Sequence, residues 1–269
     1  MTNRVDAGWL ALREPADAAA RAPELVEPIR RRLAGGALVI HDLGAGTGSM
    51  TRWLAPRLPG PQQWILYDHD ADLLERAAAT TVNDADGTPV TVRTRQCDIT
   101  RLTSEDVAGA GLVTMSALMD LLTADDLERV AAACAGAGCP ALLTLSVTGE
   151  VDLTPPDPLD ATIMDAFNAH QRRTVAGHRQ LGPDATGAAT AAFGRWGAAV
   201  RARPSPWRLG ADQPDLLVAW LRGWVGAACE QQPELTEPVA AYTARRLAEA
   251  ATGRLEAIVQ HNDLLVGYD

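Results

Sequence analysis

Short apolar runs typical of buried strands alternate with helical patterns over the first half of this chain. A strand, a helix and a second strand in the same sheet form a parallel pair joined by a right-handed crossover. The alternation therefore predicts an α/β fold around a seven-stranded, mostly parallel sheet with helices on both faces. The expected core strands are 37–43, 62–68, 89–97, 111–118 and 141–147, and helical patterns cover 70–80 and 123–137.

We expect the remaining segments to complete a single domain over residues 1–269. Residues 1–36 read as an N-terminal helical cap, interrupted by prolines at 15, 23 and 28, and residues 37–148 as the core. Residues 149–184 contain a Pro-rich loop and a helical segment, and we predict a lid, because loops leaving the carboxyl end of a parallel strand lie over the ligand crevice. Residues 185–269 supply helices, an edge strand at 198–209 and a last strand at 254–267.

Composition excludes several functions. The net charge is −10, and all 24 basic residues are arginine, which excludes a lysine base and disfavours nucleic acid as a partner.

No window has the roughly 18 apolar residues that a membrane span needs, and no secretory leader is visible, so we expect a cytoplasmic protein without a membrane partner. The four cysteines form no CxxC pair and have no histidine at zinc spacing, so no metal site is expected. A homodimer is left open.

A glycine-rich turn follows the first predicted strand, within "VIHDLGAGTGSM" at residues 39–50. A tight turn between a strand and a helix presents backbone N–H groups to an anionic ligand. The dinucleotide fingerprint G-x-G-x-x-G requires its third glycine three residues after the second, where this chain has Ser49. The glycines here are instead Gly44, Gly46 and Gly48.

With Asp42 in front, this turn resembles motif I of the class I S-adenosylmethionine (SAM)-dependent methyltransferases, acidic-x-Gly-x-Gly-x-Gly. The resemblance extends over about residues 37–147 and implies a Rossmann-like fold, SAM as cofactor, S-adenosylhomocysteine (SAH) as product, and the methionine end of SAM at the turn. Asp68 matches the family's ribose-binding acid and Asp98 its adenine-binding position, with Ile99 packing on the base. The cofactor residues expected on this basis are Asp42, Gly44, Ala45, Gly46, Gly48, Asp68, His69, Asp98, Ile99 and Ser116.

The acceptor side is less defined by sequence. Asp120 follows the fourth strand, where the family faces the methyl group, and no Asn/Asp-Pro-Pro-Tyr motif is present there, which argues against base amines as acceptors. Arg13 and Arg21 reach the cofactor carboxylate or an acidic substrate if the N-terminal helices close over the crevice. Trp207 is expected near an aromatic acceptor or the sulfonium. We therefore predict Asp120, Arg13 and Trp207 as substrate-binding residues.

Removing a proton from a hydroxyl or ammonium acceptor requires a base, and histidine is the usual choice. His170, beside two arginines on the predicted lid helix, is the candidate catalytic base. His41, His178 and His261 are assigned structural roles, and His69 is assigned to the adenosine. A mechanism that relies on proximity alone, without a protein base, is also open.

Three functions are compatible with these features. The first is a SAM-dependent methyltransferase that acts on a small-molecule acceptor in specialised metabolism. The alternative is a SAM-fold protein that uses the cofactor structurally or for a reaction other than methyl transfer. The third, an NAD-dependent oxidoreductase, rests on the glycine-rich turn alone, and the glycine spacing counts against it.

Overall fold

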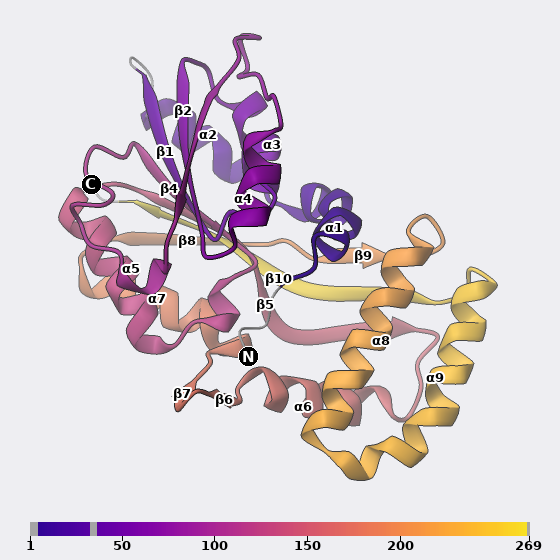
Figure 1. The fold of residues 1–269 in the computed structure, drawn as a ribbon. Helices are drawn as coiled ribbons and strands as arrows, with labels where there is room; N and C mark the ends of the chain where they lie inside the picture. Colours follow the sequence, from indigo (N-terminus) through magenta and orange to yellow (C-terminus); the bar gives the residue numbers. More distant parts are fainter. Residues whose placement is uncertain (1–4, 33–36, 268–269) are drawn as a thin grey trace.

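The computed structural model describes residues 5–32 and 37–267, and its centre is one mixed sheet (Figure 1). Strands β1 to β5 run parallel in the order β3-β2-β1-β4-β5, and β10 joins the edge of β5 antiparallel, followed by β8; β9 also pairs with β10. The fold class predicted from the sequence is confirmed. The strands are β1 (Leu38–Leu43), β2 (Gln62–Asp68), β3 (Thr91–Gln96), β4 (Leu112–Ser116), β5 (Ala141–Thr154), β8 (Ala199–Pro204), β9 (Trp207–Leu209) and β10 (Glu256–Gly267), with β6 (Thr174–Val175) and β7 (His178–Arg179) forming a separate hairpin.

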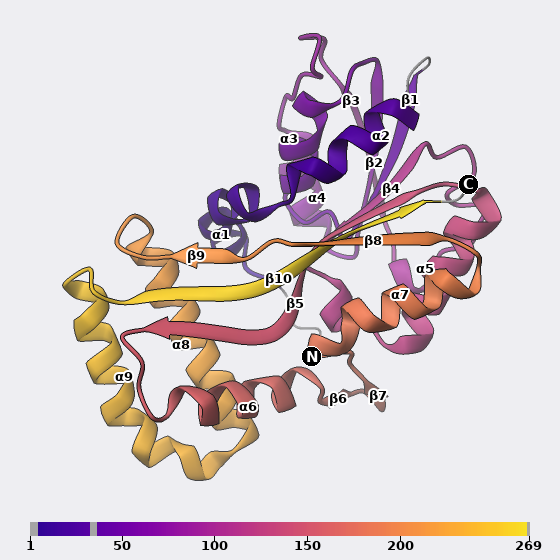
Figure 2. The ribbon, with the colours of Figure 1, turned by 180° about the vertical axis from the view of Figure 1, so that it is seen from behind.

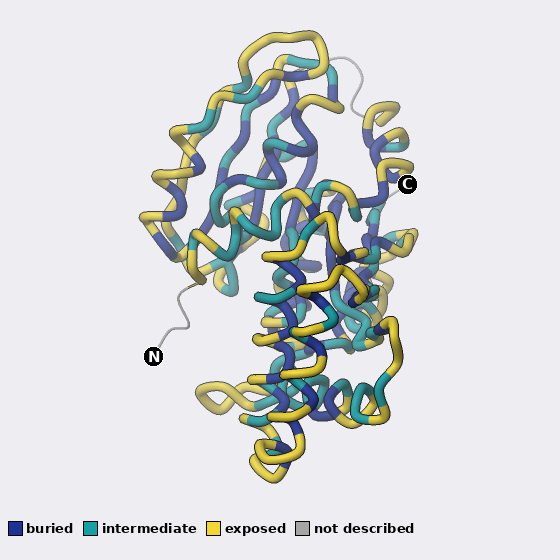
Figure 3. Tube along the Cα trace, turned by 90° about the vertical axis from the view of Figure 1, so that its right-hand side faces the viewer, coloured by how far each residue is buried: buried dark blue, intermediate teal, exposed yellow. Residues whose placement is uncertain are grey.

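Helices cover both faces of the sheet, as the crossovers require. One hydrophobic cluster packs α5 and α7 on one face, and another packs α2, α3 and α4 on the other. Figure 3 shows the buried strands between helices whose outer sides are exposed. The helices are α1 (Ala7–Ala20), α2 (Val26–Arg32), α3 (Ser49–Leu54), α4 (Ala71–Ala78), α5 (Ala124–Ala137), α6 (Asp160–Gln171), α7 (Ala185–Arg195), α8 (Pro214–Gln231) and α9 (Thr236–Ala251).

The segment predicted as a lid begins differently from expectation. Residues 149–154 continue β5, because they pair with the first part of β10, and both strands extend beyond the parallel core (Figure 2). Helices α6, α8 and α9 pack with these extensions around a third hydrophobic cluster, in which Trp220 and Trp224 stack with ring centroids 5.4 Å apart. The Pro-rich loop is therefore shorter than predicted, and a lid role for residues 155–184 stays a prediction.

The N-terminal cap also differs from the prediction at two prolines, since α1 runs through Pro15 without interruption and α2 contains Pro28. A proline inside a helix removes one backbone hydrogen bond. Burial of the next two residues, Ala16 and Asp17, at 4% exposure each offsets that loss by packing the helix against the rest of the protein. Residues 1–4 and 33–36 of the predicted cap, and residues 268–269 at the other end, lie outside the described residues. Within the described ranges, no helix combines the length and the apolar character needed to cross a membrane.

Candidate functional site

The glycine turn joins β1 to α3 at the carboxyl edge of the parallel strands. Gly44, Gly46 and Gly48 have φ angles of +67°, +54° and +84°, a region that glycine enters without strain. The side chain of Leu118, from the loop after β4, occupies the position of a Cβ on Gly44, and Leu10 of α1 lies 3.2 Å from the position of a Cβ on Gly46. The turn therefore needs glycine for its backbone and for the close approach of neighbouring elements.

Asp68, at the end of β2, is linked directly to the turn. Its Oδ2 accepts a hydrogen bond from the Gly46 N–H at 2.8 Å, and its Oδ1 accepts one from the Asp70 N–H at 3.0 Å. His69 Nδ1 lies 3.3 Å from the same carboxylate. Each carboxylate oxygen accepts more than one hydrogen bond, so Asp68 keeps acceptor capacity for the ribose hydroxyls that the sequence assigned to it.

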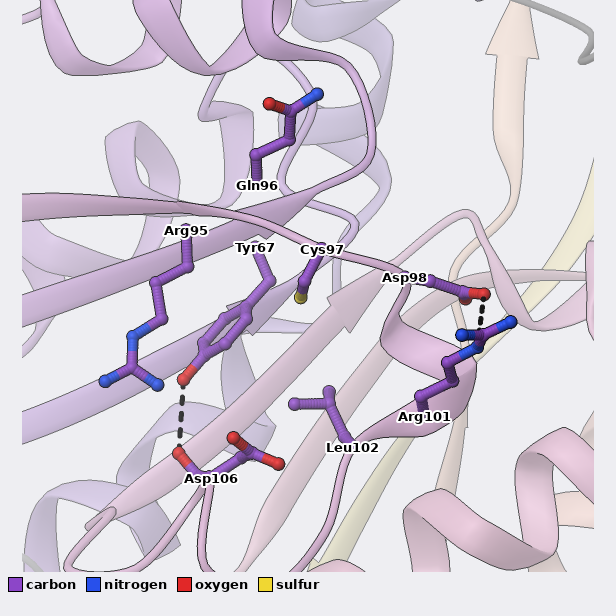
Figure 4. Close-up of a pocket in the computed structure, with 8 residues that line it drawn as sticks. All are labelled: Tyr67, Arg95, Gln96, Cys97, Asp98, Arg101, Leu102 and Asp106. Atoms are coloured by element: carbon purple, nitrogen blue, oxygen red, sulfur yellow. Dashed lines mark hydrogen bonds and ion pairs between the residues drawn. The ribbon is translucent and has the colours of Figure 1, made fainter.

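Asp98 stands at the end of β3, beside a cavity of about 520 Å³ (Figure 4). It caps a short 3-10 turn by accepting from the Thr100 N–H at 3.0 Å and the Thr100 hydroxyl at 2.7 Å, and these bonds lower its pKa. Figure 4 shows its carboxylate directed toward Arg101, with which it forms an ion pair of 3.5 Å. The adenine role of Asp98 and Ile99 stays a prediction. The cavity is lined by Tyr67, Arg95, Gln96, Cys97, Asp98, Arg101, Leu102 and Asp106.

Asp42, the acidic residue in front of the turn, is buried with one oxygen unsatisfied. Its exposed fraction is 1%, and its Oδ1 accepts a hydrogen bond of 2.7 Å from the Thr114 hydroxyl. No described residue donates to its Oδ2. Burial raises the pKa of Asp42 to about 7, although the Thr114 bond and the charge of Arg21 act in the opposite direction.

Arg21, directly after α1, is the buried cation of the same site. Its exposed fraction is 2%, and its Nη2 donates to the hydroxyls of Ser49 at 3.2 Å and Ser116 at 3.0 Å. Its Nε and Nη1 have no acceptor among the described residues. Burial lowers the pKa of Arg21, and the nearby carboxylates, Asp17 foremost, act against that change.

Arg21 and Asp42 together have two buried donor groups and one buried acceptor oxygen without a partner among the described residues. Each buried polar group without a partner costs roughly 1–3 kcal/mol, so a ligand that satisfies both stabilises the protein. An α-amino acid zwitterion has the matching groups, a carboxylate for Arg21 and an ammonium for Asp42. The methionine end of SAM is such a zwitterion, and the site therefore fits the cofactor that the sequence motif implies.

Helix α1 is attached over this site by several contacts. Glu14 accepts hydrogen bonds of 2.5 and 2.6 Å from Arg52 of α3, and the Trp53 indole donates to the Ala18 carbonyl at 3.1 Å. From the sequence, Arg21 was expected at the cofactor only on the condition that the N-terminal helices close over the crevice. The available signal was the spacing of Arg13, Asp17 and Arg21 at four-residue intervals, which places polar groups on one helix face.

Two of the three predicted substrate residues, Arg13 and Trp207, are in contact on this face of α1. Arg13 donates to Asp17 through Nε at 3.0 Å and Nη2 at 3.2 Å, and its guanidinium lies 4.8 Å from the ring centroid of Trp207. The Trp207 indole also donates to Asp17, at 2.9 Å. Burial raises the pKa of Asp120, against the opposing charge of Arg13. Residues from α1, β9 and the segment after β4 thus share one electrostatic environment.

His170, the predicted base, has both ring nitrogens engaged. Nε2 lies 3.1 Å from the Glu230 carboxylate of α8, and Nδ1 lies 3.0 Å from Nη1 of Arg173. An arginine only donates, so Nδ1 is the acceptor and Nε2 carries the proton toward Glu230. In this arrangement His170 has no unoccupied basic nitrogen, and the structure gives no support to its assignment as the base.

Comparisons with known proteins agree with this site. Residues 40–138, which contain the glycine turn, Asp68 and Asp98, match the family model described as "Methyltransferase domain". No curated protein matches the chain. Within the described residues, no group of three or more His, Cys, Asp or Glu side chains is placed to hold a metal ion.

Solved structures with a similar arrangement have low sequence identity. The cyclopropane synthase MmaA2 from Mycobacterium tuberculosis is 12% identical, with a TM-score of 0.48, over 90% of this chain and 82% of that chain. The YcgJ protein from Bacillus subtilis is 13% identical, with a TM-score of 0.49, over 91% and 98%. A SAM-dependent methyltransferase from Thiobacillus denitrificans, in complex with SAH, is 15% identical, with a TM-score of 0.44, over 98% and 99%.

The family match covers the glycine turn: residues 40–138 are similar to a methyltransferase domain, and they form the parallel part of the sheet from β1 to β4.

Proposed function

We propose that this chain is a SAM-dependent methyltransferase, with SAH as product, and that it transfers the methyl group of SAM to a small-molecule acceptor in specialised metabolism. The observation that carries the proposal is the pair of unsatisfied buried groups on Arg21 and Asp42, at the turn where the methionine end of SAM is expected. The acceptor lies beyond this pair, in the region of α1, β9 and β10.

The chain's own residues account for binding and orientation. Bound SAM supplies an activated methyl group on a sulfonium, and the transfer is an in-line displacement whose rate depends on placement. Arg21 and Asp42 hold the two ends of the amino acid, and Asp68 accepts from the ribose. Helix α1 lies over the turn and excludes water from it.

Calorimetry of SAH binding tests the cofactor site. Replacing Arg21 with Ala removes two open donors, and we expect a loss of at least tenfold in affinity, about 1.4 kcal/mol. Asp68→Ala is expected to weaken binding as well. The matched control is Arg172→Ala, because Arg172 forms an ion pair with Asp184 through partly exposed side chains. Equal affinity of Arg21→Ala and wild type would remove the main support for the proposal.

A second measurement separates methyl transfer from the alternative, a protein that holds SAM without transferring its methyl group. Mass spectrometry of reactions with mixed small hydroxyl and amine compounds should show SAH in equal amount with one methylated product. SAM bound tightly but never converted would favour the alternative. Cytoplasmic location and a homodimer stay predictions, to be tested by cell fractionation and light scattering.

A further inference from the structure

His261 differs from His170 in having one nitrogen without a partner. It lies inside β10, and its exposed fraction is 4%. Nδ1 lies 2.9 Å from the Val259 carbonyl oxygen. A carbonyl only accepts, so Nδ1 carries the proton and Nε2 has a free lone pair. No described residue forms a hydrogen bond with Nε2.

The backbone at His261 is irregular. The register between β10 and β5 shifts on both sides of it, between Val259 and His261 and between Asn262 and Leu264. Such bulges re-aim side chains and are frequent beside active sites. The side chain here packs against Trp207 of β9, with ring centroids 5.3 Å apart.

Strand register places His261 on the acceptor side of the cofactor turn. Ser116 ends β4 at the level of the turn and pairs with Thr144 of β5, whereas His261 pairs with Val147. The three-residue step along β5 from Thr144 to Val147 spans about 10 Å. On α1, the eight residues from Arg21 to Arg13 span about 12 Å. Arg21 thus lies at the cofactor turn, and Arg13 lies over His261.

The groups facing His261 are balanced in charge. The charge of Arg13 reaches His261, but Arg13 is paired with Asp17, and Asp17 also accepts from Trp207. Burial and the Arg13 charge lower the pKa of His261 to about 3, so the imidazole favours its neutral form, and burial also raises the pKa of Asp120. Binding a charged acceptor here would cost desolvation free energy, because no unpaired counter-charge faces it. An uncharged acceptor fits, and the rings of Trp9, Trp207 and His261 favour an aromatic one.

We propose that His261 binds the hydroxyl of a neutral phenolic acceptor through Nε2 and takes its proton during O-methylation. This inference rests on the proposed methyltransferase function. An alkylamine is disfavoured, because it is protonated at neutral pH and would place a cation beside Arg13.

The charges balance in this step. The phenol oxygen forms a bond to the methyl carbon, the bond from that carbon to sulfur breaks with its electron pair going to sulfur, and the hydroxyl proton moves to Nε2. The products are a methyl ether, SAH and a protonated His261. The positive charge that burial penalises on His261 appears as the charge on sulfur disappears, so the site keeps the same net charge throughout.

Binding of three naphthalene probes to the SAH-bound protein tests the inference without turnover. The probes are 2-naphthol, its methyl ether 2-methoxynaphthalene, and the cation 2-naphthylmethylammonium. We expect calorimetry to show naphthol binding about fivefold tighter than the ether, roughly 1 kcal/mol, and the cation binding weakest. In ¹⁵N NMR, naphthol should shift the His261 Nε2 resonance, and the ether should leave it unchanged.

Two variants check the assignment. His261→Phe keeps a ring but has no acceptor atom, so it should bind 2-naphthol and 2-methoxynaphthalene equally. His261→Gln keeps an acceptor atom and should retain part of the preference for 2-naphthol. Unchanged SAH affinity in both variants shows that they are folded. A preference that persists in His261→Phe, an unshifted Nε2 resonance, or no naphthol binding by wild type would overturn the inference. Failure of wild type to bind SAH would instead reject the proposed function, and the same probes then test His261 on the protein alone.

Discussion

Cofactor binding by this protein should depend on pH through Asp42. Burial raises the pKa of this carboxyl to about 7 in the free protein. Its unsatisfied Oδ2 is placed for the ligand's ammonium, which stabilises the carboxylate and lowers the pKa in the complex. Binding must therefore release a proton from any molecule whose Asp42 is protonated, and affinity for SAH should rise with pH up to about 7 and level off above it.

The magnitude follows from the fraction of ionised carboxyl. At one pH unit below the pKa only about a tenth of the molecules have the carboxylate, so the dissociation constant should be roughly tenfold higher at pH 6 than at pH 8, about 1.4 kcal/mol. Calorimetry of SAH binding between pH 5.5 and 8, in two buffers with different ionisation enthalpies, measures both the affinity and the protons released.

Two variants identify the titrating group. Asp42→Asn cannot ionise, so its affinity should be lower and independent of pH across this range. Thr114→Val removes the 2.7 Å hydrogen bond that stabilises the carboxylate, and should move the rise in affinity to higher pH. A flat profile for wild type, or an unchanged slope in Asp42→Asn, would refute the reasoning.

The remaining predictions concern stability and closure. Gly44→Ala should cost about 1–2 kcal/mol of unfolding free energy because of the positive φ angle, with further cost from the contact with Leu118, measurable by urea unfolding; equal stability would show that the turn relaxes. Glu14→Gln removes the carboxylate that pairs with Arg52 and should speed proteolysis within α1 with little change in the melting of the core; an unchanged cleavage rate would contradict the attachment of α1. Asp160→Asn weakens the ion pair with Arg246, whose side chain is 1% exposed. The free energy of unfolding should fall by about 3 kcal/mol, and the affinity for SAH should not change. A loss of SAH binding would argue against a separate structural role for this ion pair.

Local sequence signals determined much of the fold and led to the proposed cofactor. The order of strands and helices follows from the spacing of apolar residues, which each segment carries by itself. The three glycines predicted a tight turn, and Gly44 shows one reason for glycine there, since its positive φ angle strains any other residue. Asp68 ends its strand as predicted and contacts the turn through Gly46.

Only the tertiary structure decided which polar atoms have partners. Pairing with β10, more than 100 residues away, extends β5 to Thr154, and no local pattern in that Pro-rich stretch predicts it. His170 lies in a sequence that suits a base, but Glu230 and Arg173 engage both of its nitrogens. His261 looked structural, and a carbonyl of its own strand leaves Nε2 free. Residue type sets what a group can donate or accept, whereas burial and partners come from segments that meet only in the folded chain.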